Sequence, residues 1–134
     1  MITVFLGGTC NGSKWRERVM PLLTVDYFNP VVEEWNEEAQ KNEEFHREND
    51  DFVLYVLTPK MVGTYAVAEV VDDSNKRPKK TILCTLRKDG DAEFDNAQWK
   101  SISKVTSLVA KNGATVLGGL DEVVDFLNRQ KEVK

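Results

Sequence analysis

The sequence has few of the residues that build disulfide frameworks and metal centres, and it has no long apolar run. It contains two cysteines, Cys10 and Cys84, which lie far apart without C-x-x-C spacing, and one histidine, His46. This content argues against a disulfide scaffold and against a zinc site. No apolar run approaches the roughly 20 residues that cross a bilayer, and the N-terminus lacks the positive charge that precedes the apolar run of a signal peptide. We therefore expect a cytoplasmic protein with no membrane partner.

An excess of positive charge is also lacking. The chain has 18 lysine and arginine residues against 22 aspartates and glutamates, which gives a net charge of −4. A duplex-binding surface needs a clustered basic face, and the one basic cluster, at residues 76–80, is predicted to be a solvated connection. The acidic stretch 33–51 follows no metal-loop spacing and is predicted to be an exposed helix face. We expect no duplex nucleic acid partner, no metal and no other cofactor.

What the chain does contain is a regular alternation of strand and helix patterns, which predicts one domain over residues 1–134. Amphipathic segments predict five helices, of which the second covers about 36–49 and the fourth 97–111. The stretch 88–96, rich in Asp and Gly, is predicted to be a loop. Short apolar runs predict strands at 2–6, 25–28, 52–57, 81–84 and 115–117.

This βαβαβαβαβα order predicts an α/β fold. Strands separated by helices run parallel, with right-handed crossovers and helices on both faces of the sheet. Five strands in a chain of this length favour a flavodoxin-like (Rossmann-like) doubly wound sheet of order 2-1-3-4-5. In that order the binding crevice opens at the carboxyl ends of strands 1 and 3. The loops 7–13 and 58–64 should meet there, with Asn29-Pro30 on the same edge.

The first of these loops resembles a phosphate cradle without matching a standard one. It is neither G-x-G-x-x-G nor G-x-x-x-x-G-K-[ST]. Gly7-Gly8 would let backbone approach a ligand closely, and the helix N-terminus that follows favours anions. A tight turn without a ligand explains the same glycines equally well. Ser13 is predicted to cap the helix.

Two groups are candidates for chemistry. Cys10 lies in the first loop, but nothing in the pattern brings it near His46, which is predicted to be a surface residue. Glu69 lies in the otherwise uncharged run 61–71, in the second turn of a predicted helix, where desolvation would raise its pKa and its nucleophilicity. A helical wheel places Glu69 about 200° from Val67, so a solvent-facing orientation remains an open alternative.

Several short motifs together resemble those of a known family. They are VFLGGTCNGSKWR at the N-terminus, Asn29-Pro30 followed by Glu34-Trp35, the strand DDFVLYVLTP, and a helix glutamate shortly after Gly-Thr. In this order they are similar to the nucleoside 2-deoxyribosyltransferase family, most of all to its short, divergent branch, over residues 1–84. The resemblance implies a flavodoxin-like fold. It also implies a glutamate that attacks C1′ of a 2′-deoxynucleoside, releases the base and forms an ester, which a second base or water resolves.

The resemblance also implies roles for individual residues. Glu69 would be the nucleophile, and the family habit of placing sites near subunit contacts makes a homo-oligomer a further expectation. The family's aspartate before Gly-Thr is missing from 59–62, with Glu34 and Asp51 as candidate substitutes, and the interval from Gly-Thr to the glutamate is longer than usual. The expected substrate-binding residues are Gly7 and Gly8 at the sugar, Asn29 and Trp35 towards the base, Tyr65 against the substrate, Lys60 at a phosphate, and Thr9, Thr58 and Gly63 in the two loops.

Two functions remain open at this level. One is cleavage or transfer of the N-glycosidic bond of 2′-deoxynucleosides or their monophosphates. The other is a non-catalytic module that binds a nucleotide in the same crevice, which the missing aspartate favours. A flavin carrier or a receiver domain is a weaker match, because a receiver needs acids where Gly7-Gly8 and Thr58-Pro59 stand.

Overall fold

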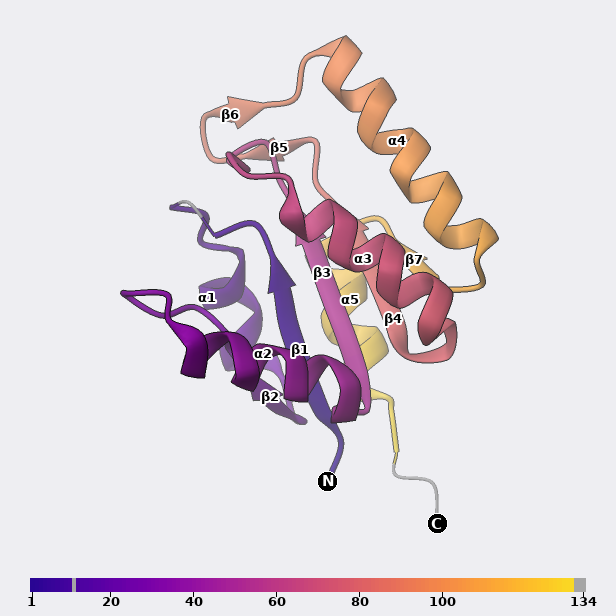
Figure 1. Cartoon of the computed structure of the whole chain (residues 1–134). Helices are drawn as coiled ribbons and strands as arrows, with labels where there is room; N and C mark the ends of the chain where they lie inside the picture. The colour runs from indigo at the N-terminus through magenta and orange to yellow at the C-terminus, as the bar shows by residue number, and fades with distance from the viewer. Residues whose placement is uncertain (11, 132–134) are drawn as a thin grey trace.

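The computed structural model describes residues 1–10 and 12–131. Its main elements follow one another with short connections, and two single-turn 3₁₀ helices, Met20–Leu22 and Pro78–Lys80, precede β2 and β4 (Figure 1). The elements are β1 (Thr3–Gly8), α1 (Trp15–Val19), β2 (Asp26–Phe28), α2 (Glu37–Asn49), β3 (Phe52–Leu57), α3 (Tyr65–Lys76), β4 (Thr81–Thr85), β5 (Lys88–Asp89), β6 (Ala92–Glu93), α4 (Asn96–Lys111), β7 (Thr115–Leu117) and α5 (Leu120–Asn128).

The main sheet has five parallel strands in the order β2-β1-β3-β4-β7. This is the predicted 2-1-3-4-5 order, with β7 as the fifth strand, so the doubly wound α/β fold is confirmed. The chain winds from β1 to β2 in one direction and from β2 back across β1 to β3 in the other. The switch point therefore lies between β1 and β3, at the edge where Gly8 pairs with Val56.

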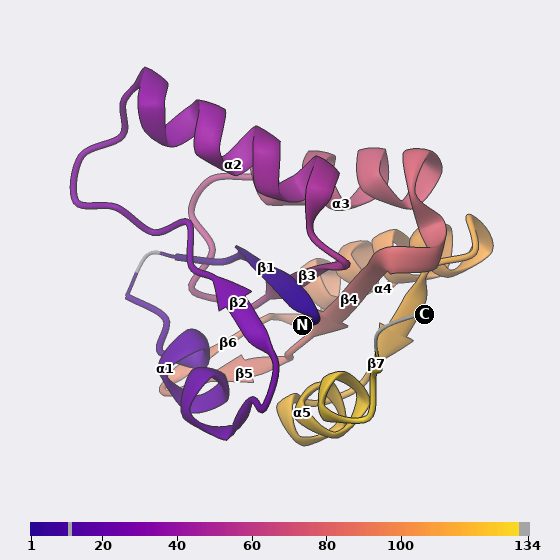
Figure 2. The ribbon, with the colours of Figure 1, turned by 90° about the horizontal axis from the view of Figure 1, so that it is seen from below.

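Helices cover both faces of the sheet, α2, α3 and α4 on one side and α1 and α5 on the other (Figure 2). Each strand divides its residues between two cores because successive side chains point to opposite faces. The core under α1 and α5 includes Val4, Leu6, Trp15, Val19, Leu54, Val56, Val123 and Leu127. The core under α3 and α4 includes Phe5, Val53, Tyr55, Leu57, Val70, Leu83 and Val109.

Two local predictions differ from the structure. The 88–96 stretch contains the β5–β6 hairpin, whose two-residue strands are too short and too charged to produce an apolar pattern. The prediction that Ser13 caps the first helix is wrong, because α1 begins at Trp15 behind Lys14 and has no side-chain cap. The Ser13 hydroxyl instead donates to Asp89 Oδ2 at 2.5 Å, and this bond joins the first loop to the hairpin.

His46 is half-buried, and the prediction of a surface position for it is only partly correct. Its ring stacks on Phe28, with centroids 3.7 Å apart and planes 7° apart. Its Nδ1 lies 2.8 Å from Asp50 Oδ1. Burial raises the pKa of Asp50, and the hydrogen bond with His46 opposes that shift. His46 thus fixes α2 against β2.

Within residues 1–10 and 12–131, no helix is long and apolar enough to cross a membrane.

Candidate functional site

A pocket of about 510 Å³ lies at the carboxyl ends of β1 and β3, at the switch point. One wall is the loop after β1, a second is the start of α3, and α2 with the segment before it forms the third. Seven of the ten predicted site residues line this pocket: Gly7, Gly8, Thr9, Trp35, Gly63, Tyr65 and Glu69. The topology therefore brings residues from three separate segments of the chain into one cavity.

The other three predicted residues lie outside the lining. Asn29 Oδ1 accepts a hydrogen bond from the Val31 amide at 3.1 Å. Thr58 is fully buried, and its hydroxyl accepts from the Lys60 amide at 3.2 Å. The Lys60 ammonium lies over the β5–β6 hairpin, 3.3 Å from where a Cβ on Gly90 would be. Lys60 is thus placed against the hairpin, away from the cavity.

The two glycines at the end of β1 are required by packing. A Cβ on Gly7 would lie 2.8 Å from ring atoms of both Phe5 and Tyr55. Gly8 has a φ of 114°, which L side chains rarely adopt, and a Cβ there would collide with the Val56 backbone. The tight turn alone therefore explains Gly8, while both glycines also line the pocket.

One end of the pocket holds the guanidinium of Arg16, which is only 5% exposed. Arg16 donates to three backbone carbonyls, with Nε 3.0 Å from Leu6 O, Nη1 2.8 Å from Thr9 O and Nη2 3.4 Å from Gly8 O. Burial lowers its pKa, and the nearby Cys10 and Glu43 oppose that shift. Among the described residues no carboxylate forms an ion pair with Arg16, and its hydrogen bonds to backbone are all to carbonyl dipoles.

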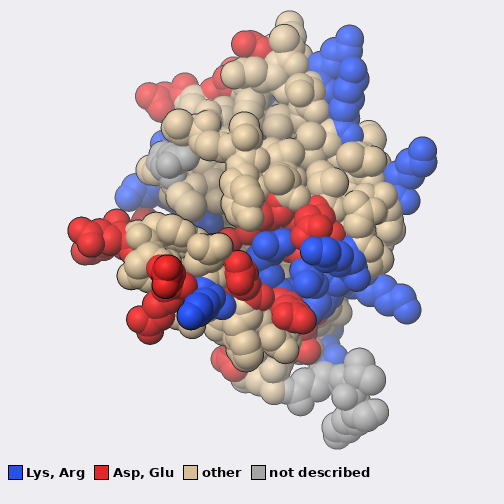
Figure 3. All heavy atoms as spheres, in the orientation of Figure 1, with Lys and Arg blue, Asp and Glu red and all other residues tan. Residues whose placement is uncertain are grey.

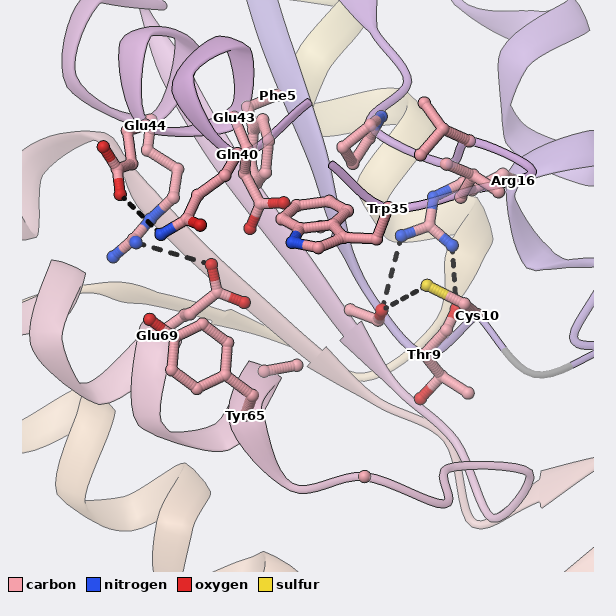
Figure 4. A pocket seen from close by; sticks show the side chains of 18 of the residues that line it. Phe5, Thr9, Cys10, Arg16, Trp35, Gln40, Glu43, Glu44, Tyr65 and Glu69 are labelled. Atoms are coloured by element: carbon pink, nitrogen blue, oxygen red, sulfur yellow. Dashed lines mark hydrogen bonds and ion pairs between the residues drawn. The ribbon is translucent and has the colours of Figure 1, made fainter. Parts of the chain in front are cut away.

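The opposite part of the pocket holds Glu69, which is 8% exposed (Figure 4). Its orientation, which periodicity leaves open, is therefore inward. Burial raises the pKa of Glu69 to about 8; a hydrogen bond and the charge of Glu43 act in the same direction, and Arg47 acts against them. In the described part of the chain, Glu69 Oε2 is buried and accepts no hydrogen bond, although Arg47 Nη1 lies 3.4 Å away. A carboxylate with a free buried oxygen is well suited to nucleophilic attack.

Arg47 reaches this carboxylate from α2. Its Nε lies 3.1 Å from Asp73 Oδ2 and its Nη2 lies 2.9 Å from Asp73 Oδ1. Burial acts to lower the pKa of Arg47, but the hydrogen bonds and charge of Asp73 outweigh burial, and the net shift is upward. Tyr55, from β3, donates to the same aspartate at 2.5 Å, and burial followed by the charge of Asp73 raises the pKa of Tyr55.

The sequence interpretation missed Glu43, Arg47 and Arg16. The first two lie on α2, which is so polar that the sequence predicts an exposed helix there. Residues four apart share a helix face, so Glu43 and Arg47 point the same way, and this spacing was the available signal. Arg16 follows the buried Trp15, and nothing in the sequence indicates that its charge is buried too.

Neither candidate substitute for the missing family aspartate lines the pocket. Glu34 is exposed, and Asp51 Oδ2 accepts from the Thr3 amide at 2.9 Å, at the amino end of β1. Glu43 and Glu44 line the cavity in their place. In the ranges that the structure describes, no group of three or more His, Cys, Asp or Glu side chains could hold a metal ion.

Acidic and basic side chains are interleaved on the face where α2 meets α3 (Figure 3). Arg47 bridges the two helices there and contacts Asp72 as well as Asp73, while Lys76 pairs with Asp72 at 3.1 Å. The ion pairs on this face therefore join α2 to α3.

Comparison with known proteins gives two matches. A family model described as nucleoside 2-deoxyribosyltransferase like matches residues 1–88, a range that contains every lining residue of the pocket. A stretch of 79 residues, 54% of this chain, is 32% identical to the protein translocase subunit SecA of Prochlorococcus marinus (strain NATL2A). That stretch covers 8% of the SecA protein, so the chain spans a small part of this curated relative.

Proposed function

The chain belongs to the nucleoside 2-deoxyribosyltransferase-like family, and from this premise we propose that it breaks the N-glycosidic bond of a 2′-deoxynucleoside or its 5′-monophosphate. Glu69 is the nucleophile. The observation that carries the proposal is a buried carboxyl group in the switch-point pocket, one oxygen of which accepts no hydrogen bond from the described residues. Membership of the family supports a nucleoside-related function, and the choice of Glu69 and of the substrate is ours.

The proposed reaction begins with the proton that Glu69 and Glu43 share. The raised pKa of Glu69 means that this carboxyl is protonated near neutral pH, so it must release a proton before it attacks. Glu43 takes this proton, and a Glu69 oxygen then bonds to C1′ as the C1′–N bond breaks. The electron pair leaves with the base, which receives the proton from Glu43. Water or a second base then displaces Glu69 from C1′ and gives its proton to Glu43, which restores the starting pair.

The positions of the aromatic side chains fit a nucleoside in this pocket. In Figure 4 the carboxylate of Glu43 lies between the carboxylate of Glu69 and the indole ring of Trp35. Trp35 is 57% exposed and Tyr65 72% exposed, although both line the cavity. Exposed aromatic rings at a pocket mouth are suited to stack on a base. We assign the base to Trp35 and the deoxyribose to the space between Glu69 and Gly7.

The buried cation at the other end favours a monophosphate over a free nucleoside. Arg16 has donors left after its three carbonyl bonds, because a guanidinium carries five N–H groups. Its charge lacks a carboxylate partner in the described chain, and a phosphate would supply the missing negative charge. We therefore assign the phosphate to Arg16 and not to Lys60, which the sequence alone had favoured.

The test is release of free base from purified protein. Deoxynucleosides and their 5′-monophosphates are incubated with the protein, with and without a second base, and the products are separated by chromatography. Glu69→Gln should lower the rate by about a thousandfold or more. Glu48→Gln, which changes an exposed glutamate on the same helix as Glu43 but outside the pocket, should leave it unchanged. New nucleoside formed from the second base identifies transfer, and free sugar identifies hydrolysis. Base release that survives Glu69→Gln at full rate contradicts the assignment.

The non-catalytic alternative is a nucleotide-binding module. It rested on the missing aspartate, and Glu43 now provides a second carboxylate beside Glu69. Binding of a monophosphate by calorimetry, without release of base from any substrate in the panel, would favour this alternative.

A further inference from the structure

Asp73 lies outside the pocket lining, yet it is the carboxylate with the most donors around Glu69. It is fully buried on α3, one turn after Glu69. It accepts hydrogen bonds from the Tyr55 hydroxyl at 2.5 Å and from Arg47 at 2.9 and 3.1 Å, and it forms an ion pair with Arg77. Donors from three elements thus hold this carboxylate in one place.

Arg47 transmits that position to the pocket. Its guanidinium is a rigid, planar fork. Asp73 occupies the edge formed by Nε and Nη2, which leaves Nη1 directed at Glu69. The resulting contact, 3.4 Å from Nη1 to Glu69 Oε2, is an ion pair without a hydrogen bond. Asp73 therefore decides how closely the positive charge can approach Glu69.

The other charged groups around Glu69 do not provide this control. Glu43 faces it from α2 and is also a carboxyl group, which raises the pKa of Glu69 and supplies no positive charge. Asp72, next to Asp73, also contacts Arg47, at 3.4 Å, but its side chain is 45% exposed and solvent screens it. Tyr55, from β3, stays neutral because burial and Asp73 raise its pKa. Arg47 is the cation that contacts Glu69, and its stronger bonds go to Asp73.

We propose that Asp73 is a positioning residue that keeps Arg47 from forming a two-bond pair with Glu69 and so preserves a free Glu69 oxygen for attack on C1′. Without Asp73, the guanidinium would turn its edge to Glu69. A carboxylate bound by two guanidinium N–H groups is more stable as an anion and less nucleophilic. This inference rests on the proposed role of Glu69.

The first test compares Asp73→Asn with Asp72→Asn. Both changes remove one negative charge within reach of Arg47, but only Asp73→Asn removes the two-bond partner. Because the leaving base needs the proton that Glu69 and Glu43 share, loss of that proton sets the alkaline limb of the kcat profile. For Asp73→Asn we expect this limb to move down by about one pH unit or more, kcat below that limb to fall about tenfold, and KM to stay within about twofold. Asp72→Asn should shift the limb far less.

A second readout needs no turnover. The side-chain carboxyl of Glu69 is titrated by ¹³C NMR in the free protein, with Glu69→Gln used to assign its signal. We expect a midpoint near the raised value in the wild type and a lower one in Asp73→Asn. Equal midpoints in folded Asp73→Asn and Asp72→Asn would overturn the inference. If no substrate releases base, the NMR shift still decides the role of Asp73, so the two proposals fail separately.

Arg47→Lys covers the case in which Asp73→Asn does not fold, as judged by circular dichroism. A lysine keeps the charge but carries it on a single nitrogen, so it lacks the planar fork with which Arg47 spans Asp73 and Glu69. Asp73 should retain the ammonium, so Glu69 loses its cation and its midpoint should rise. A midpoint at or below that of the wild type would contradict the inference.

Discussion

A buried arginine, Arg16, and a half-buried one, Arg47, line the same pocket and have opposite surroundings. Arg16 donates to three backbone carbonyls and forms no ion pair with a carboxylate of the described residues, and burial lowers its pKa. Arg47 donates to carboxylates, and its pKa is raised despite burial. The first is a cation whose charge has no anion beside it, and the second is a cation whose charge is already neutralised. An arginine side chain thus favours anion binding at one end of the pocket, where Arg16 lies, and controls the position of a carboxylate at the other end, where Arg47 lies.

The largest effect expected from this comparison comes from Arg16→Met, which keeps most of the volume and removes the charge. A charge-assisted hydrogen bond contributes about 1.5–3 kcal/mol, so affinity for a deoxynucleoside monophosphate should fall roughly ten- to hundredfold. Affinity for the free deoxynucleoside should change little. Calorimetry with both ligands measures the ratio. Lys60→Met is the matched comparison, and a larger loss with Lys60→Met would return the phosphate to the hairpin side.

At the end of the pocket that holds Glu69, the raised pKa of this residue predicts an unusual dependence of stability on pH. Because the pKa of Glu69 is raised to about 8 in the folded protein, the folded state binds this proton more tightly than the unfolded state does. The stabilisation is complete below the unfolded pKa, about 4.3, and is lost as the pH rises through about 8. The free energy of unfolding should fall across that window, by at most about 1.4 kcal/mol for each unit of the pKa shift.

Urea unfolding at a series of pH values measures this slope. In Glu69→Gln, residue 69 cannot titrate, so the free energy of unfolding should change less with pH than in the wild type over the same range. Since Asp50 also has a raised pKa, the difference between the two proteins, and not the slope of either, is the relevant quantity. Identical slopes would show that Glu69 titrates normally.

The smallest effect concerns Trp35, which lines the pocket between the two arginine ends. Stacking of a base on an aromatic ring contributes about 1–3 kcal/mol, so Trp35→Ala should weaken binding about tenfold. The loss should be equal for nucleosides and monophosphates, in contrast to the selective loss with Arg16→Met. A loss confined to monophosphates would place the phosphate, and not the base, at Trp35.

The sequence predicts the sheet well because the strands are apolar runs bounded by turn residues. The predicted strand 52–57 is β3 as observed, and the strand order follows from connectivity alone. The pocket position follows from the same topology, which is why seven of ten residues fall in its lining. Local signals failed where a distant partner decides the outcome, as for Ser13, whose hydroxyl binds Asp89 on the hairpin.

The charge interactions in the site could not be predicted from the sequence in the same way. Periodicity leaves the direction of Glu69 open, and its burial depends on α2 packing across α3. The acidic segment that contains Glu43 and Arg47 resembles an exposed helix until a second helix covers it. Pairing between helices is a tertiary property, and no spacing within one segment encodes it.

The central claim is that Glu69 bonds to the sugar. The measurement is the intact mass of the protein after brief mixing with a 2′-deoxynucleoside monophosphate in the absence of an acceptor base, followed by acid quench and peptide mapping. We expect an added 5-phospho-2-deoxyribosyl group on the peptide that contains Glu69, and none in Glu69→Gln. Release of base at the same rate in both proteins, with no adduct on that peptide, would contradict it.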